Sequence, residues 1–146
     1  MTKINKIKKI PLIIVKIEGG GKHILVKGKI NSEKVFLLID TGASNSIFDK
    51  DFHALNKDKL EHMNSETSSS SFNSSIEEFY TGEDIFLSLS RFRITLENVI
   101  FTSFTHVNAL YESLNLPTIS GILGSDFLIE NNAVIDFPNK LLLLER

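Results

Sequence analysis

A run of five apolar residues, 35–39, ends at a carboxylate, and this junction constrains the fold more than any other part of the chain. An uninterrupted apolar run of this length is typical of a strand buried on both faces. Asp40 follows it directly, and because desolvating an isolated carboxylate is costly, we expect a specific role for this side chain. Thr41 supplies a hydroxyl, and Gly42 allows a sharp turn with close backbone approach. The alternative is an ordinary turn, since an Asp-[Ser/Thr]-Gly triplet occurs by chance in about one chain in fifteen of this length.

Most of the remaining chain reads as short strands separated by turn residues. Helices are predicted at 107–115, which stops before Pro117, and at 49–55, where Asp49 can cap the first turn. Turns are predicted at 19–21, which is all glycine, and at 138–140, which begins with proline. The pattern therefore predicts an all-β domain with a few short helices. The predicted strands, rich in Ile, Val, Leu and Phe, are 9–17, 24–30, 35–39, 46–48, 85–89, 92–104, 134–137 and 141–144.

Composition excludes several classes of protein. The 146 residues suit one compact domain, and the absence of cysteine excludes disulfide scaffolds, thiolate metal sites and cysteine nucleophiles. A formal charge of −2 gives no support for a nucleic-acid or membrane partner. Lys16 ends the apolar run 10–15 too early for a secretory signal, and no run approaches the roughly 20 apolar residues that span a bilayer. We expect a cytoplasmic protein by default, provided that no export segment is missing.

Charge is unevenly distributed along the chain. The first 34 residues carry nine lysines against Glu18 and Glu33, a net charge of +7, which leaves −9 on the remaining 112 residues. Lysines on edge strands discourage association between sheets, and we favour this explanation. A specific acidic partner is the alternative.

A second motif lies downstream of the first. Residues 121–128 read Gly-Ile-Leu-Gly-Ser-Asp-Phe-Leu, two apolar residues and a glycine before a helix-like stretch that Ser125 or Asp126 can cap. In order and spacing, this segment and residues 36–44 together resemble the retropepsin-like aspartic proteases. The resemblance covers about residues 24–144. Including the Val-Ile-Asp-Phe segment at 134–137, it is greater to the bacterial and cellular branch than to the viral enzymes.

The resemblance implies a fold and a division of the chain. The fold would be all-β and retropepsin-like, the closed β-barrel of half a pepsin, with one or two short helices. Residues 24–146 would form the retropepsin-like aspartic protease domain. Residues 1–23 would be a basic N-terminal strand segment of the same domain.

The resemblance also implies an activity, that of an aspartic endopeptidase. Because the chain has a single Asp-Thr-Gly, the site requires a homodimer in which Asp40 of each subunit meets at the two-fold axis. Two adjacent carboxylates share one proton, so one acts as base toward a water while the other donates to the peptide carbonyl. Thr41 would join the two loops by hydrogen bonds, and Gly42 would let the substrate backbone lie close. No metal or cofactor is implied.

The resemblance also implies that further residues contact the substrate, which would be a peptide or protein with apolar side chains. Residues 122–124 would back the paired carboxylates and line apolar subsites. The serine-rich segment 64–75 is expected to be a mobile loop in the position of the family's flap, which commonly carries glycines. Phe72 would act there either as a lid or as an anchor. The predicted substrate-binding residues are Ala43, Ser44, Ile122, Leu123, Gly124, Ser71 and Phe72.

The chain departs from the viral members where their subunits form ion pairs. Ser44, Asn45 and Ser125 stand where those members commonly carry charged side chains, so a dimer would need other contacts. A monomeric, catalytically inactive retropepsin-like module that binds a peptide or protein is therefore the alternative. The four histidines show no zinc-site spacing and are expected at the surface. Asp136 is expected to be a turn or edge residue.

Overall fold

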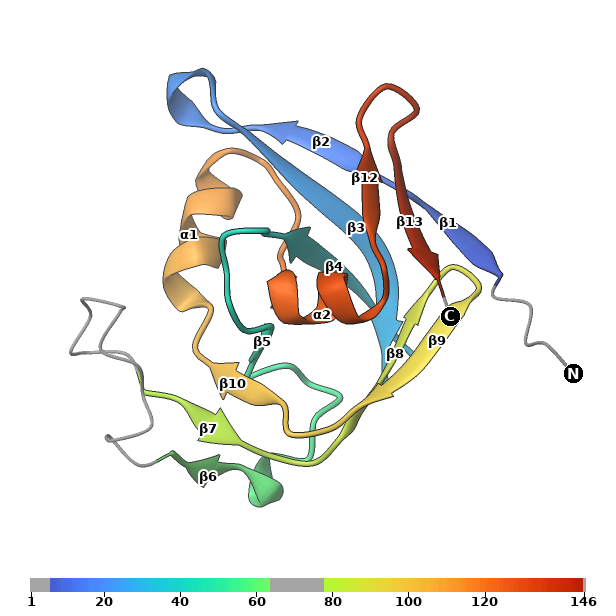
Figure 1. Ribbon diagram of the computed structural model, residues 1–146. Coiled ribbons are helices and arrows are strands. Elements are labelled where there is room, and N and C mark those ends of the chain that lie inside the picture. The colour runs from blue at the N-terminus through green and yellow to red at the C-terminus, as the bar shows by residue number, and fades with distance from the viewer. Residues whose placement is uncertain (1–5, 64–77, 146) are drawn as a thin grey trace, which may run out of the picture.

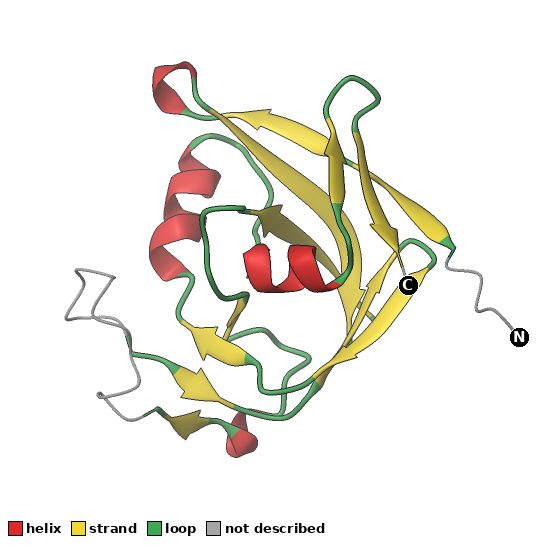
Figure 2. Cartoon of the chain, viewed as in Figure 1, coloured by secondary structure: helices red, strands yellow, loops and turns green. Residues whose placement is uncertain are grey.

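The computed structural model describes residues 6–63 and 78–145 (Figure 1). Strands dominate the structure, and they form a curled ten-stranded sheet and a three-stranded sheet (Figure 2). The helices are α1 (Thr105–Ser113), α2 (Ser125–Glu130) and two 3-10 turns at Glu18–Gly20 and Lys57–Lys59. The strands are β1 (Ile7–Pro11), β2 (Ile13–Lys16), β3 (Lys22–Ile30), β4 (Glu33–Ile39), β5 (Ile47–Asp49), β6 (Glu61–His62), β7 (Tyr80–Thr81), β8 (Ile85–Leu89), β9 (Phe92–Leu96), β10 (Ile100–Thr102), β11 (Gly121–Leu123), β12 (Val134–Asp136) and β13 (Leu141–Glu145).

Strand β4 lies in the middle of the larger sheet and is buried on both faces, as its apolar run predicts. Leu37 and Ile39 point into one apolar cluster with β8, β9 and α2 residues, whereas Leu38 joins a second cluster around Tyr111 of α1. The sheet order is β6-β7-β10-β5-β11-β4-β3-β8-β9, with β2 beside β3. The loop that follows β4 is therefore anchored by one of the most enclosed strands of the molecule.

Two of the pairings in this sheet are parallel, and one of them brings the two sequence motifs together. β11 runs parallel to β4, with Ile122 opposite Leu38 and Leu123 opposite Ile39. Because parallel strands end at the same edge, the segments that follow the two strands start side by side. The Asp40 loop and helix α2 are therefore neighbours, although more than 80 residues separate them along the chain.

The smaller sheet has the order β1-β13-β12 and brings the two ends of the described chain together. The predicted single strand at 9–17 is wrong, because β1 pairs with β13 whereas β2 pairs with β3. The break falls at Leu12, after Pro11, where the Leu12 N–H donates to the Lys140 carbonyl at 2.9 Å. The predicted strand pair at the C-terminus is confirmed as β12 and β13.

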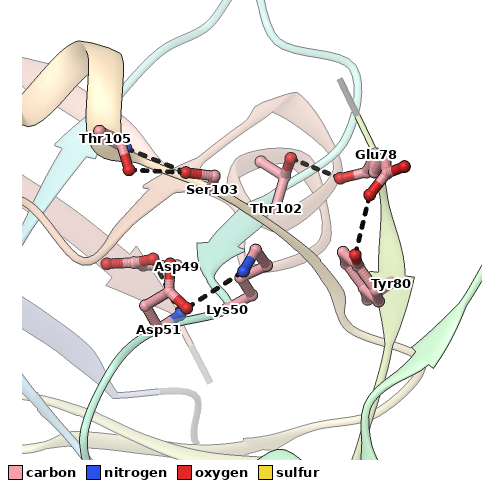
Figure 3. A network of polar contacts seen from close by, with 8 residues as sticks. All are labelled: Asp49, Lys50, Asp51, Glu78, Tyr80, Thr102, Ser103 and Thr105. Carbon is pink, nitrogen blue, oxygen red and sulfur yellow. Dashed lines mark hydrogen bonds and ion pairs between the residues drawn. The ribbon is translucent and has the colours of Figure 1, made fainter. Parts of the chain in front are cut away.

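The helix predicted at 49–55 is also wrong. The Asp49 carboxylate accepts from the Asp51 N–H at 3.0 Å, which forms a local turn rather than a helix cap (Figure 3). Asp49 itself is the last residue of β5 and pairs with Thr102 of β10. The predicted strand 92–104 is two strands, β9 and β10, interrupted near Asn98, which has a positive φ of 55°.

The predicted class is confirmed, because the chain is mostly β-structure with a curled sheet and two short α-helices. The helix predicted at 107–115 is α1, displaced by two residues toward the N-terminus. Within residues 6–63 and 78–145, no helix is long and apolar enough to cross a membrane. The loop predicted at 64–75 lies outside the described residues, and the division at residue 23 stays a prediction.

Candidate functional site

The Asp40 loop is held by backbone hydrogen bonds at the point where β4 ends. The Asp40 N–H donates to the Leu123 carbonyl of β11 at 3.0 Å, which continues the β4–β11 pairing by one residue. Its Oδ1 accepts from the Gly42 N–H at 2.9 Å, and its carbonyl accepts from the Ala43 N–H at 3.1 Å. The carboxylate is therefore fixed in a tight turn, with Oδ1 engaged by the backbone two residues ahead.

The loop also packs directly against the start of α2. The Ser125 N–H donates to the Ala43 carbonyl at 2.7 Å. At Gly124, a Cβ atom would stand 2.5 Å from the same carbonyl oxygen and 3.1 Å from backbone atoms of Asn45. Only glycine allows this close approach, which explains why a glycine stands at position 124 in the second motif.

A polar cluster joins the end of the loop to α2. Ser46 Oγ donates to Asp126 Oδ1 at 2.7 Å and accepts from the Gly124 N–H at 2.9 Å. The Ser46 N–H donates to Asp126 Oδ2 at 3.0 Å. The expected cap at Ser125 is wrong, because Gly124 is the N-cap residue. The expected role of Asp126 is confirmed in part, because its Oδ1 accepts from the Phe127 N–H of the first turn at 2.8 Å, while the same carboxylate also bonds to Ser46. Sequence reasoning missed this pairing because no local signal connects residues 80 positions apart.

Asp40 is exposed in the single chain, although Ile39 before it is only 4% exposed. The desolvation that the sequence predicts for this carboxylate is therefore not found in one chain. Thr41 and Gly42 are exposed as well. The Thr41 hydroxyl makes no hydrogen bond to any residue that the structure describes, and no second carboxylate among these residues contacts Asp40.

A pocket of about 320 Å³ adjoins Asp40 and Thr41. Its lining is mostly apolar and includes Ile24, Leu38 and Phe137, and Lys22 and His23 add polar groups. Lys22, His23, Ile24 and Phe137 were not predicted as site residues, because they come from β3 and from the β12–β13 turn, far along the chain from Asp40. The pocket suits an apolar side chain placed next to the carboxylate.

His23 is half-buried rather than a surface residue. Its Nδ1 lies 2.6 Å from the hydroxyl of Tyr111, a fully buried residue of α1, and the two rings stack at 5.8 Å between centroids. Burial raises the pKa of Tyr111 because the phenolate would lose hydration. This contact ties the pocket wall to α1. The other three histidines, His53, His62 and His106, are exposed as expected.

The remaining predicted residues fall into two groups. Leu123 is fully buried in the core and Gly124 is buried against the loop, so in the single chain these two back the site from behind. Ala43 and Ile122 are half-buried and Ser44 is exposed. Ser71 and Phe72 lie outside the described residues. Asp136 is the last residue of the edge strand β12, and its carboxylate accepts from the Asn139 N–H and side-chain amide of the turn that follows, which lowers its pKa.

The predicted flap segment lies outside the described residues, but the strands that flank it, β6 and β7, form a short two-stranded stem. β6 and β7 pair, and the Met63 N–H donates to the Phe79 carbonyl at 2.8 Å. A polar network fixes this stem to β10: Thr102 Oγ1 donates to the Glu78 carbonyl at 2.8 Å, and the Tyr80 hydroxyl donates to the Glu78 carboxylate at 3.0 Å (Figure 3). No group of histidines and carboxylates that could hold a metal ion occurs in the part of the chain that the structure describes.

These features define the retropepsin-like fold, and comparison with solved structures agrees. The retroviral protease-like domain of Ddi1 from Leishmania major matches with a TM-score of 0.52 and 16% identity, covering 82% of this chain and 86% of that chain. A retropepsin-like aspartic protease from Rickettsia conorii matches with a TM-score of 0.51 and 17% identity, covering 99% of this chain and 95% of that chain. No family model and no curated protein matches the sequence. The chain therefore has the fold of retropepsin-like aspartic proteases.

Proposed function

We propose that this chain is an aspartic-type endopeptidase that acts as a homodimer. The observation that carries the proposal is the placement of Asp40. Its carboxylate is exposed, and it is held in a tight turn that hydrogen bonds fasten to β11 and α2. Rigid support of an exposed acidic group is what a catalytic carboxylate requires. Asp40, Thr41 and Gly42 are the proposed catalytic residues.

The proposed mechanism uses one Asp40 from each of two chains. The charged carboxylate takes a proton from a water, the water oxygen adds to the peptide carbonyl carbon, and the protonated carboxyl donates its proton to the carbonyl oxygen. In the collapse of this intermediate, the carboxyl that took the water proton gives it to the amide nitrogen, a diol hydroxyl returns its proton to the other carboxylate, and the C–N bond breaks. The pair is then left with one proton, as at the start. The free hydroxyl of Thr41 is available to bond across the two-fold axis.

Exposed apolar side chains on α2, on β12 and in the turn after β12 support dimerisation. Ile129 of α2 is 77% exposed, Val134 of β12 is 53% exposed, and Phe137 is 55% exposed. β12 is an edge strand of the smaller sheet, and Phe137 shares a pocket with Asp40. A second copy that covers these side chains would bury them and would bring two Asp40 carboxylates into a desolvated site. Such contacts differ from the ion pairs of the viral members.

The pocket beside Asp40 supports a preference for apolar side chains. Ile24, Leu38 and Phe137 provide apolar walls directly next to the carboxylate. Ala43, Ser44 and Ile122 are the proposed additional contacts to an extended peptide. Leu123 and Gly124 are proposed to position the loop from behind.

The proposal is tested by incubating wild-type protein and the Asp40→Asn variant with a complex peptide library and identifying the products by mass spectrometry. Cleavage by the wild type alone is expected between about pH 4 and 7, where a pair of carboxylates that shares one proton is active. Asp84→Asn is the matched control, because Asp84 is exposed and far along the chain from the loop. Equal cleavage by Asp40→Asn would refute the assignment.

The alternative, a monomeric binding module, predicts no cleavage at any concentration. The two functions are separated by dilution. Activity that depends on a dimer falls faster than linearly when the protein is diluted through the dissociation range. A protein that remains monomeric at high concentration and cleaves nothing would support the binding module instead.

A further inference from the structure

A row of polar and basic side chains crosses four strands of the larger sheet. Lys34 of β4 lies opposite Lys29 of β3, Lys29 lies opposite Ser88 of β8, and Ser88 lies opposite Arg93 of β9. Directly opposed residues of antiparallel strands share a face, so the four side chains form a single row. The adjacency of β4, β3, β8 and β9 can be followed in Figure 1. With strands about 4.8 Å apart, the row is about 14 Å long.

The positive charges of this row are not neutralised by any salt bridge within residues 6–63 and 78–145. Lys29, Lys34 and Arg93 are all exposed, and none of them forms a salt bridge with any residue that the structure describes. Lys27, two residues before Lys29 on the same face of β3, adds a fourth positive charge. Like charges directly opposite each other destabilise a strand pair. The pairing of Lys29 with Lys34 is therefore unfavourable in the isolated chain, and a bound anion would relieve it.

The basic row borders a groove of about 720 Å³. The groove is lined on its apolar side by Pro11, Ile13 and Phe36. Lys27 lies over the Phe36 ring, with its Nζ 5.8 Å from the ring centroid. Phe86, two residues before Ser88 on the same face of β8, is 44% exposed. The surface thus offers apolar contacts and positive charge at adjacent positions.

We propose that this groove binds an acidic polypeptide segment that also carries apolar side chains. Its carboxylates would pair with the basic row, and its apolar side chains would contact Ile13 and Phe36. A long polyanion such as nucleic acid or an anionic membrane fits less well, because the residues after position 34 carry a net charge of −9 and would repel an anion that extends beyond the groove.

This groove is separate from the site around Asp40. Lys34 precedes Asp40 by six residues on β4, which corresponds to about 20 Å along an extended strand. Binding in the groove therefore does not depend on the proposed peptidase activity. The Asp40→Asn variant is expected to bind the acidic segment as tightly as the wild type does.

The test is fluorescence anisotropy with a labelled peptide of repeated Glu-Glu-Leu units, compared with its Gln-Gln-Leu counterpart. The glutamate peptide is expected to bind, and binding should weaken as salt concentration rises. The double variant Lys29→Gln/Lys34→Gln should bind roughly fivefold to tenfold more weakly. The matched control is Lys57→Gln/Lys59→Gln, which removes the same charge from exposed lysines outside the groove and should leave binding unchanged.

A further variant separates loss of binding from loss of folding. Lys29→Glu places opposite charges across from each other, so its Tm should rise while its affinity for the glutamate peptide falls. Equal affinity for the two peptides, or undiminished binding by Lys29→Gln/Lys34→Gln, would overturn the proposal. Binding of duplex DNA or phosphatidylserine vesicles through the same two lysines, without binding of the peptide, would also overturn it and would indicate a phosphate-binding surface.

Discussion

Replacement of Gly124 by alanine tests how the Asp40 loop is held against α2. The added Cβ would stand 2.5 Å from the Ala43 carbonyl oxygen, whereas real contacts of this kind are essentially never below 3.0 Å. The obstructing atoms belong to the backbone, so the loop or the start of the helix must move by at least the difference between these two distances. Such a movement lengthens the Ser125–Ala43 hydrogen bond and disturbs the bond from the Gly124 N–H to Ser46.

The expected change in the unfolding free energy of Gly124→Ala follows from two opposing effects. Overpacking costs about 1–3 kcal/mol, and the lower entropy of the unfolded alanine chain returns about 0.4–1 kcal/mol. The Gly124 φ of −95° is accessible to alanine, so no additional strain from a left-handed conformation applies. From the middle of each range, about 2 minus about 0.7, the net loss of unfolding free energy should be about 1.3 kcal/mol, which corresponds to a decrease in Tm of roughly 3–8 °C.

Urea unfolding and thermal unfolding followed by circular dichroism measure this effect. Gly21→Ala is the control, because its φ of −70° suits alanine and its Cβ would closely approach only side-chain atoms of Ile17, at 3.1 and 3.2 Å, while the Glu18 carbonyl oxygen, a backbone atom, is 3.9 Å away. The control should stay within about 0.5 kcal/mol of the wild type. If Gly124→Ala is as stable as Gly21→Ala, the close approach of the loop to α2 does not exist and the reasoning is refuted.

Three further substitutions have defined outcomes. Ser46→Ala removes the hydroxyl that joins the Asp40 loop to α2 and should cost about 1–3 kcal/mol in urea unfolding; an unchanged midpoint would contradict the network. Gly28→Ala would place a Cβ 2.6 Å from the β8 backbone and should cost about 1–3 kcal/mol, whereas full stability would mean that β3 and β8 are not so close. Tyr111→Phe removes the hydrogen bond to His23 and should cost about 0.5–1.5 kcal/mol near neutral pH. Because burial raises the Tyr111 pKa above its usual 10.0, wild-type stability should fall as the pH rises through that raised pKa. Unfolding measured from about pH 9 to 11 should show a smaller decrease for the phenylalanine variant, and equal decreases would contradict this role.

The parts of the fold that sequence predicted correctly are those determined by neighbouring residues. The apolar run 35–39 is a strand buried on both faces, and the turn beginning at Pro138 joins β12 to β13. In each of these segments the local pattern and the tertiary environment favour the same structure. The Asp40 turn is also local, since its hydrogen bonds join residues two and three positions apart.

The errors arise where distant partners decide the structure. Residues 9–17 have a uniform strand pattern, yet they divide between two strands. β1 pairs with β13 and β2 pairs with β3, and these two partner strands are far apart along the chain. Asp49 is a residue type that commonly caps helices, but here it is the last residue of β5 and pairs with β10. Asp126 accepts from the Phe127 N–H of its own helix as a cap would, but its bonds to Ser46, 80 positions away, have no local signal. The exposure of Asp40 could not be predicted either, because it depends on how the loop projects from the sheet.

The most direct test of the central claim is to mix wild-type and Asp40→Asn chains at constant total concentration, allow subunits to exchange, and measure peptide cleavage against the fraction of wild-type chains. If each active site takes one Asp40 from each of two chains, activity follows the square of that fraction, and an equal mixture retains about a quarter of the wild-type rate. A linear dependence, with about half the rate in the equal mixture, would show that a single chain suffices and would contradict the account.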